Sequence, residues 1–255
     1  MTAQLELTAL KNFPLIEPRD DLVAIIIQSL KDSGLVLENG DVLVLAQKVI
    51  SKAENRYAYL NDVKPSEHAI ALGKKTDKDA RVVDLILNES NAVVRHRKGV
   101  IIVEHSLGYV HANAGIDQSN IQSDATNPRV LLLPKNPDAS AANLRFELKQ
   151  QTGVEAAVII NDSAGRAWRE GTQGFAIATA GFKPLLDLVG QVDLFERQLE
   201  ATKVAVADEL AAAASFLMGQ AAEGAPVVLI RGAKLVPYHL GSCDLIRERA
   251  HDLFR

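Results

Sequence analysis

The sequence predicts an α+β fold with a mixed, mainly antiparallel sheet and packed helices. Segments of strand length and helical stripes do not alternate regularly, which argues against a doubly wound parallel sheet. The middle of the chain holds short strand-like runs separated by turn residues, which favours antiparallel hairpins. No repeat or linker composition divides the 255 residues. We therefore expect one domain over 1–255, with room for a second lobe whose boundary no segment marks.

The N-terminal part begins with helices and strands that have clear end signals. Asp20 or Asp21 can cap the first helix, because an Asp side chain accepts hydrogen bonds from free N–H groups at a helix start. The run DVLVLA is apolar without alternation, which is typical of a strand buried on both faces. The expected elements are a strand over Gln4–Thr8, a helix from Leu22 to Leu30 stopped by Gly34, the strand Asp41–Ala46, a polar segment Gln47–Glu54, a helix capped by Ser66, and a helix over Asp77–Glu89.

The remaining elements follow from the same signals. Four short middle strands are expected to be connected by hairpins. The last predicted helix rests on apolar residues at helical spacing, namely Leu199, Val206, Leu210, Ala213 and Leu217. In order, we expect strands Ala92–Arg97, Val100–Glu104, Gly108–Ala112 and Val130–Leu133, a helix Ala139–Gln151 closed by Gly153, a buried strand Val154–Ile160, a glycine-containing segment Arg166–Gly181, a helix Phe195–Met218, and a strand Ala225–Ile230.

Composition and charge exclude several classes of protein. The 28 basic and 32 acidic residues give a net charge of −4, which provides no basic surface for duplex nucleic acid. The single cysteine, Cys243, excludes an internal disulfide and a multi-cysteine metal site, and it fits a reducing cytoplasm. The N-terminus lacks signal-peptide features, and the longest apolar stretch is about half the ~20 residues of a spanning helix. We expect a cytoplasmic protein with neither nucleic-acid nor membrane partners.

Candidate chemistry lies in polar segments, because common catalytic motifs such as the phosphate-binding loop and the nucleophile elbow are absent from the sequence. His105 and His111 could form a metal pair, but their neighbours favour ordinary strand positions. In Asn113–Asn120, Asp117 follows a strand and can face a hard cation. The other interpretation of this segment is a turn, since Asn, Gly, Asp and Ser are the commonest turn residues.

Two further segments offer ligands for metal and phosphate. In Asn161–Arg166, Asp162 and Ser163 can bind Mg²⁺ at the end of a buried strand, or they can form a cap or an Asx turn. The small residues of Met218–Ala225 allow a backbone to approach phosphates, or they can simply end a helix. Positive charge comes from Lys48, Lys52 and Arg56, which could neutralise a triphosphate or lie on a solvated loop.

Together, these segments resemble the coenzyme F420-0:gamma-glutamyl ligase family. The resemblance covers most of residues 5–235, and its segments stand in the family's order. No single segment is specific, but the combination is. The segments are FPLI at Phe13–Ile16, GDVLVLAQKVISKAENR at Gly40–Arg56, NAGIDQSN at Asn113–Asn120, LLLPKNPDASA at Leu131–Ala141, VIINDSAGRAWREG at Val158–Gly171, and ADELAAAASFLMGQAAEGAPVVLIRG at Ala207–Gly232.

The resemblance implies a GTP-dependent amide ligase with a two-lobed ligase fold and an intimate homodimer. Such an enzyme activates the carboxylate of coenzyme F420-0 as an acyl phosphate and joins it to L-glutamate, with further γ-linked glutamates as an extension. It implies two divalent cations, Mg²⁺ or Mn²⁺, and allows K⁺. The implied metal ligands are Asp117, Asp162, Ser163 and Gln220. The implied GTP contacts are Lys11, Asn12, Phe13, Pro14, Gln47, Lys48, Lys52, Asn120, Met218, Gly219, Gln220, Ala221, Ala222, Glu223, Gly224 and Ala225.

Two other functions remain open at this point. One keeps the ligase chemistry but uses a different carboxylated acceptor. The other is a GTP- and metal-binding protein without turnover. Three departures from the family pattern leave this second function open. Gln220 stands where some members have an acidic residue, Asn161 replaces a Ser or Thr, and Ala221–Ala222 replace a glycine-richer loop. Retention of Asp117, Asp162 and Ser163 argues for an enzyme.

Overall fold

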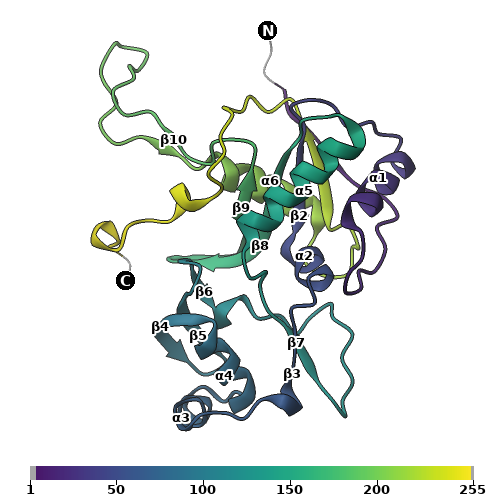
Figure 1. Cartoon of the computed structure of the whole chain (residues 1–255). Helices are drawn as coiled ribbons and strands as arrows, with labels where there is room; N and C mark the ends of the chain where they lie inside the picture. Colours follow the sequence, from purple (N-terminus) through teal and green to yellow (C-terminus); the bar gives the residue numbers. More distant parts are fainter. Residues whose placement is uncertain (1–3, 254–255) are drawn as a thin grey trace.

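A five-stranded sheet forms the centre of the molecule in the computed structural model, which describes residues 4–253 (Figure 1). The strands β2 and β8 pair in parallel, and the other three neighbouring pairs of this sheet are antiparallel. The prediction of a mixed, mainly antiparallel sheet is therefore confirmed. In spatial order, the strands are β1 (Glu6–Ala9), β12 (Val227–Arg231), β2 (Val42–Ala46), β8 (Ala157–Arg166) and β9 (Arg169–Ala180).

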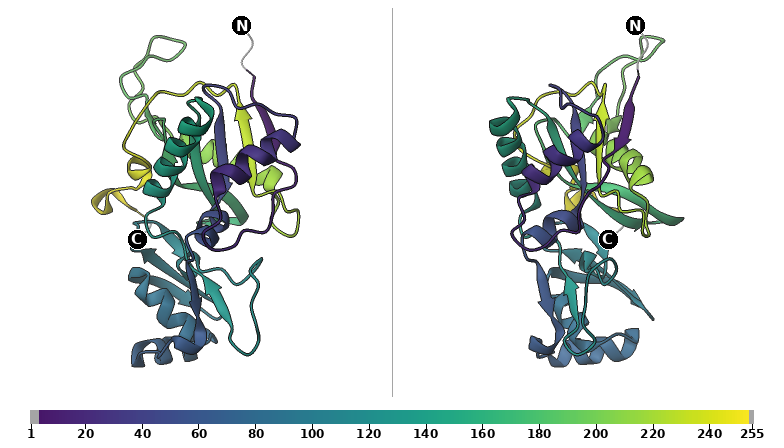
Figure 2. Two further views of the ribbon diagram at one scale, coloured as in Figure 1. Left: turned by 45° about the vertical axis from the view of Figure 1, so that its right-hand side comes forward. Right: turned by 90° about the vertical axis from the view of Figure 1, so that its right-hand side faces the viewer.

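Helices cover both faces of the central sheet (Figure 2). On one face lie α1 (Leu22–Asp32) and α5 (Pro137–Thr152), and on the other lies α6 (Val206–Met218). Alternate residues of β2 serve the two cores, since Leu43 belongs to the α1–α5 core and Val44 to the α6 core. Burial on both faces explains why this strand is apolar without alternation.

The chain between β3 (Tyr57–Tyr59) and β7 (Arg129–Leu131) forms a separate body, which we call the insert. It lies below the central sheet in Figure 1. The strands β3 and β7 pair with each other, and β4, β5 and β6 form a second small sheet. A third hydrophobic core lies here. The other elements of the insert are α3 (Glu67–Thr76), α4 (Ala80–Asn88), β4 (Ser90–Arg97), β5 (Val100–His105) and β6 (Val110–Ala112).

The helix ends follow the side-chain signals in the sequence. Asp21 caps α1 by accepting a hydrogen bond from the N–H of Ala24, and Ser66 caps α3 through the N–H of Ala69. Gly153 ends α5 with a φ of 73°, a left-handed conformation that favours glycine. Local capping chemistry therefore located these helices correctly.

Four segments differ from the sequence prediction. The predicted helix Phe195–Met218 is wrong in its first part, because α6 begins at Val206 and Lys203–Val204 forms β11, which pairs with β10 (Leu186–Asp187). The polar segment Gln47–Glu54 is helical, as α2 (Gln47–Ala53). The segment Arg166–Gly181 is mostly the strand β9, and β7 pairs with β3 instead of forming a hairpin with β6.

The chain from β10 to β11 projects from the body as a long hairpin, which we call the arm (Figure 1). Large apolar side chains on the arm are exposed, notably Val192, Leu194 and Phe195. No helix within residues 4–253 has the length and apolar character needed to cross a membrane.

Candidate active site

A cleft of about 530 Å³ opens where the parallel pairing of β2 with β8 ends, at Ala46 and Asn161. The predicted end of the second of these strands at Ile160 is wrong, because β8 continues to Arg166 through its pairing with β9, and Asp162 and Ser163 therefore lie within the strand. The walls of the cleft come from the start of α2, the segment before α1, the insert, and the loop after α6. The cleft therefore collects residues that are distant in sequence. Of the residues implied by the family resemblance, the cleft is lined by Phe13, Pro14, Gln47, Lys48, Lys52, Asn120, Asp162, Ser163, and the whole loop Met218–Ala225 with Gln220.

Gln47 connects the β2–α2 corner to the insert. Its side chain is buried, and its Nε2 donates a hydrogen bond to Asp117 Oδ2 at 2.6 Å. Its Oε1 accepts a hydrogen bond from Ser51 Oγ at 2.9 Å, which fixes the orientation of the amide. Lys48 Nζ lies 3.1 Å from Asp117 Oδ1. Two consecutive residues of α2 thus hold both carboxylate oxygens of Asp117.

The carboxylate of Asp117 lies in an unfavourable electrostatic environment. Burial raises its pKa to about 6, the charge of Asp162 adds to the increase, and Lys48 and Gln47 oppose it. The two carboxylates are thus close enough to repel each other. A divalent cation between them would remove the repulsion, because carboxylate oxygens are the ligands that Mg²⁺ prefers.

Asp162 follows a register shift in the β8–β9 pairing at Asn161. Its Oδ2 lies 3.0 Å from His111 Nε2, and its Oδ1 accepts a hydrogen bond from the N–H of Ser163 at 2.8 Å. His111 Nδ1 lies 2.9 Å from the carbonyl oxygen of Ala112. Burial alone would lower the pKa of His111, but these two acceptors raise it overall. An imidazolium ring would donate to both of them.

Basic and polar groups tie three cleft segments together. Lys52 Nζ donates to the carbonyl oxygen of Asn120 at 2.8 Å, and Asn120 Nδ2 donates to that of Ala221 at 2.9 Å. Burial and the nearby charge of Lys48 lower the pKa of Lys52. The two ammonium groups therefore repel each other, and a polyanion between them would be stabilised. This arrangement suits the phosphates of a nucleotide.

The loop after α6 folds back on itself at the cleft. Gly219 has a φ of 73°, and a Cβ there would clash with the side chain of Glu223. The Glu223 carboxylate in turn accepts a hydrogen bond from the N–H of Ala221 at 2.8 Å. Gln220 Nε2 donates to Ser215 Oγ at 3.0 Å. The Gln220 side-chain oxygen therefore remains the group with which this residue could bind a cation.

Some residues singled out from sequence lie outside the cleft lining. The N–H of Lys11 donates to Ser33 Oγ, and Asn12 Nδ2 lies 3.3 Å from Asp32 Oδ2. Asp117 is not among the residues that line the cleft, although it contacts both Gln47 and Lys48.

The two histidines considered as a metal pair occupy β5 and β6, as their neighbours predicted. His105 Nδ1 accepts a hydrogen bond from the N–H of Leu107 at 3.0 Å. Burial lowers the pKa of His105 to about 4, with smaller contributions from His111 and Arg56. His105 is thus neutral at ordinary pH, whereas His111 pairs with Asp162.

Sequence reasoning missed several contributors to the cleft. The guanidinium of Arg129 lies 3.9 Å from the ring centroid of Tyr57, and both residues line the cleft. The two lie on the paired strands β3 and β7, so no local pattern joins them. The contact of His111 with Asp162 spans 51 residues, and the sequence gives no local signal for it either. The strand β3 was not among the elements predicted from the sequence, so no signal joined Tyr57 to Arg129.

The chain matches the sequence model of the family described as F420-0:Gamma-glutamyl ligase over residues 11–232. It belongs to this family. It is 43% identical to the coenzyme F420:L-glutamate ligase of Methanothermobacter thermautotrophicus, over 98% of this chain and 99% of the relative. It is 46% identical to the protein of that name from Methanocaldococcus jannaschii over 86% of each chain, and 40% identical to that from Archaeoglobus fulgidus over 90% and 88%.

The donor set of this F420-0:gamma-glutamyl ligase family member fits magnesium or manganese. No group of three or more His, Cys, Asp and Glu side chains gathers as a metal site within residues 4–253. Mg²⁺ does not require one, because it is usually bound by one or two carboxylates together with substrate phosphates and water. Asp117 and Asp162 supply the carboxylates, and Ser163 adds a hydroxyl at the cleft.

Proposed function

We propose that this protein is a GTP-dependent ligase that joins L-glutamate to the carboxylate of coenzyme F420-0 and releases GDP and phosphate. One observation carries the proposal. Asp162 of β8 lines the same cleft as Lys48 and Lys52, and Asp117 of the insert, which contacts Lys48 and Gln47, is close enough to repel it. Sites that need both a cation and a polyanion have this composition. The relatives' name, coenzyme F420:L-glutamate ligase, supplies the substrates.

The reaction needs activation, because a carboxylate is a poor electrophile. An oxygen of the acceptor carboxylate attacks the γ-phosphorus of GTP, the bond to the β-phosphate oxygen breaks, and GDP leaves. The amine of glutamate then attacks the acyl carbon, phosphate leaves, and the amine loses its proton. Positioning and charge neutralisation do most of the work in phosphoryl transfer. The same steps could extend the product by a further γ-linked glutamate.

The chain's own residues divide these tasks. Asp117 and Asp162 would hold one divalent cation, with Ser163 and Gln220 holding a second, and K⁺ is a further candidate. When bound, such cations neutralise charge on the phosphates. Lys48 and Lys52 attract the polyanion at the cleft wall. The other nucleotide contacts proposed are Lys11, Asn12, Phe13, Pro14, Gln47, Asn120 and the loop Met218–Ala225.

We also propose that the protein is a cytoplasmic homodimer made of one ligase domain, with the insert as its second lobe. The exposed Leu194 and Phe195 of the arm support the dimer, because apolar side chains on a projection need a partner surface. Light scattering tests it. A 27.6 kDa monomer at micromolar concentration would contradict the dimer. The double variant Leu194→Ser, Phe195→Ser should favour the monomer if the arm contributes.

The ligase activity is tested by incubating the protein with coenzyme F420-0, L-glutamate, GTP and Mn²⁺. We expect a product one glutamate heavier by mass spectrometry, with one phosphate released for each glutamate added. Omission of glutamate should abolish the product, and ATP should replace GTP poorly. Phosphate release without glutamylated product would point to another acceptor, and no release at all would favour a binding protein without turnover.

A further inference from the structure

The imidazole of His111 connects the insert to the central sheet. His111 belongs to β6, its side chain is only 7% exposed, and its Nε2 lies 3.0 Å from Asp162 Oδ2 on β8. Among the described residues, Asp162 lines the cleft and His111 does not. Any effect of His111 on the cleft must therefore pass through the carboxylate of Asp162.

The position of the His111 ring is restrained by its neighbours. Its Nδ1 lies 2.9 Å from the carbonyl oxygen of Ala112. The ring of Phe175, the register partner of Asp162 on β9, lies 5.7 Å away between centroids and is tilted by 45°. Tyr109 meets the same Phe175 ring in a T-shaped arrangement at 6.2 Å and donates a hydrogen bond from its hydroxyl to the backbone of β9. A ring restrained in this way can hold a carboxylate in one orientation.

The backbone between His111 and Asp117 has an uncommon conformation. The three residues Asn113–Gly115 have consecutive φ angles of 52°, 54° and 65°. Left-handed angles are unfavourable for a residue with a Cβ, yet Ala114 adopts one and is fully buried. A Cβ on the last of the three would lie 2.9 Å from Leu133 Cδ1, so the packing here is close. The surrounding structure thus fixes how His111 and Asp117 lie relative to each other.

Asp162 keeps acceptor capacity for a cation beside its contacts with the protein. Its Oδ1 accepts a hydrogen bond from the N–H of Ser163 at 2.8 Å, and its Oδ2 faces Nε2 of His111. A carboxylate oxygen has about two lone pairs, so each oxygen retains one of them. Because both oxygens have a partner, the carboxylate cannot rotate without breaking a hydrogen bond. Carboxylates that bind metals in proteins are commonly held by such partners.

We propose that His111 is a positioning residue that holds the carboxylate of Asp162 in the orientation that binds a divalent cation. Its Nε2–H donates to Asp162 Oδ2, and that donor is present both in the imidazolium and in the neutral tautomer with its proton on Nε2. The role therefore does not depend on the charge of the ring. The inference rests on the proposed function, which makes Asp162 a cation ligand. The insert then serves the cation site through β6 as well as through Asp117.

Two amide variants separate the roles of the ring nitrogens. In His111→Gln, the amide nitrogen can take the place of Nε2 and still donate to Asp162. In His111→Asn, the shorter side chain reaches only as far as Nδ1 did, so the donor to Asp162 is lost.

Calorimetric titration of Mn²⁺ alone into the full chain measures the effect of each variant. The affinity of His111→Gln for Mn²⁺ should stay within about threefold of the wild type, whereas that of His111→Asn should fall about 10–100-fold, as for loss of a partner that orients a metal ligand. If His111→Asn does not fold, His111→Ser takes its place, because it is smaller and also cannot reach Asp162. Melting temperatures of the same preparations show which variants are folded.

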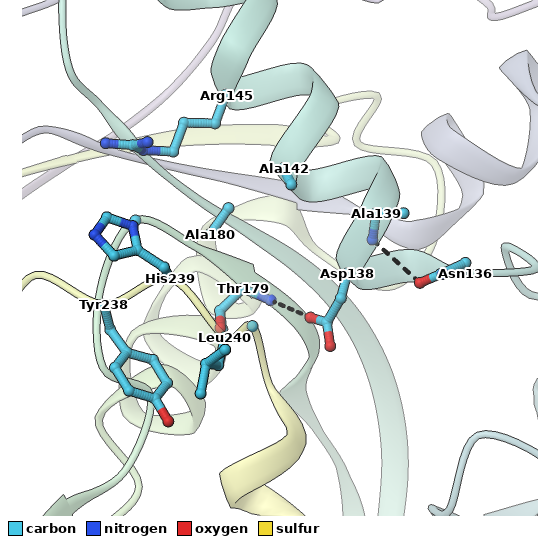
Figure 3. Close-up of a pocket in the computed structure, with 12 residues that line it drawn as sticks. Asn136, Asp138, Ala139, Ala142, Arg145, Thr179, Ala180, Tyr238, His239 and Leu240 are labelled. Atoms are coloured by element: carbon cyan, nitrogen blue, oxygen red, sulfur yellow. Dashed lines mark hydrogen bonds between the residues drawn. The ribbon is translucent and has the colours of Figure 1, made fainter.

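Two controls show whether the effect passes through Asp162. When Asp162→Asn is also present, the two His111 variants should bind Mn²⁺ with equal affinity, because the carboxylate that they hold differently is gone. Ser242→Ala removes a hydroxyl donor from Asp138, another carboxylate held by the protein, and should leave the affinity for Mn²⁺ unchanged. Figure 3 shows Asp138 bonded to the N–H of Thr179 beside α5, away from the cleft lining.

Several results would overturn the proposal. Equal Mn²⁺ affinities of His111→Gln and His111→Asn would do so, whether both are normal or both are reduced. A wild-type protein that does not bind Mn²⁺ would also contradict it, and a difference that persists beside Asp162→Asn would mean that His111 acts elsewhere. The titration contains no GTP or acceptor and measures no turnover, so a failure of the ligase reaction would leave its result unchanged.

Discussion

Two regions of the molecule hold carboxylates in opposite ways. In the first turn of α5, Asp138 accepts hydrogen bonds from the N–H of Thr179 and from both the N–H and hydroxyl of Ser242. At the cleft, Asp117 and Asp162 repel each other. Asp138 thus fastens the C-terminal segment to the sheet with partners that the protein itself supplies. The cleft pair is desolvated and mutually repelling, so a cation bound from outside would stabilise it.

This contrast shows which buried carboxylates are structural and which are poised for a ligand. Where backbone donors surround a carboxylate, its charge is already stabilised. Where a second carboxylate is near, the folded protein bears a cost that a bound cation can relieve. The family membership of the chain agrees with this division, since the matched residues 11–232 include both cleft carboxylates.

The largest expected effect is on turnover in Asp162→Asn. The variant keeps the shape and one carbonyl oxygen, but it removes a negative charge from the cation site. Glutamate-dependent GTP hydrolysis with F420-0 as acceptor should fall about 10²–10⁴-fold, or ~3–5 kcal/mol, as for loss of one electrostatic stabiliser. The melting temperature, measured on the same preparation, should change little.

Asp187→Asn is the matched control, because that carboxylate lies on the arm beside Lys203 and far from the cleft lining. It should leave turnover unchanged. If Asp162 only shaped a turn, Asn would replace it well, since both residues serve as caps. Near-normal turnover of Asp162→Asn, or a loss of turnover that only follows unfolding, would mean that Asp162 holds no cation. The contrast between the cleft carboxylates and Asp138 would then fail.

The pH dependence of stability gives a smaller effect. The pKa of Asp117 is raised from 3.8 to about 6, so the folded state binds more protons than the unfolded state between these values. The free energy of unfolding should therefore fall as pH rises from about 4 to about 6, by about 1–3 kcal/mol in the absence of metal. Asp117→Asn should remove this fall.

Urea unfolding at pH 4.5 and pH 7 measures this difference in both proteins. The other titrating groups, including His111, are common to both, so the comparison isolates Asp117. Adding Mn²⁺ at pH 7 should stabilise the wild type more than Asp117→Asn, because binding to the folded state adds to its stability. If the free energy of unfolding depends on pH equally in both proteins, the charge of Asp117 does not destabilise the folded state.

The last expected effect, of a size similar to the pH effect, concerns the packing of β9 beside the cleft. A Cβ on Gly174 would lie 2.5 Å from Ser215 Cβ and 2.6 Å from both the Ala211 carbonyl oxygen and Asn161 Oδ1. Gly174→Ala should therefore lower the free energy of unfolding by about 1–3 kcal/mol through overpacking. Gly165→Ala, where nothing lies within 4 Å, is the control. Equal stability of the two variants would mean that α6 shifts freely.

Local signals in the sequence predicted much of the fold. Asp21 and Ser66 marked the helix starts, and the unbroken apolar run of β2 indicated burial on both faces. The predictions failed where pairing between distant segments decides the local structure. The residues before Val206 had helical spacing, but pairing of β11 with β10 placed Lys203–Val204 in a hairpin instead. Sequence spacing alone does not reveal such competition.

The candidate site was predicted in a similar way. Asp162, Ser163 and the Met218–Ala225 loop were identified as polar segments at the end of a strand and of a helix, and they line one cleft, although Asp162 and Ser163 lie within β8 rather than at its end. The contacts that connect them were not predictable. The hydrogen bond from Gln47 to Asp117 spans 70 residues, and that from Asn120 to Ala221 spans 101. Only the folded chain brings these partners together.

Calorimetric titration of GTP into the protein, with Mn²⁺ and again after chelation, tests the central claim most directly. If Asp117 and Asp162 hold a cation that bridges to the phosphates, chelation should weaken GTP binding to the wild type at least about tenfold, or ~1.4 kcal/mol. Asp162→Asn should show a much smaller dependence on Mn²⁺. Wild-type GTP affinity that is unaffected by the chelator would contradict the assignment of these two carboxylates.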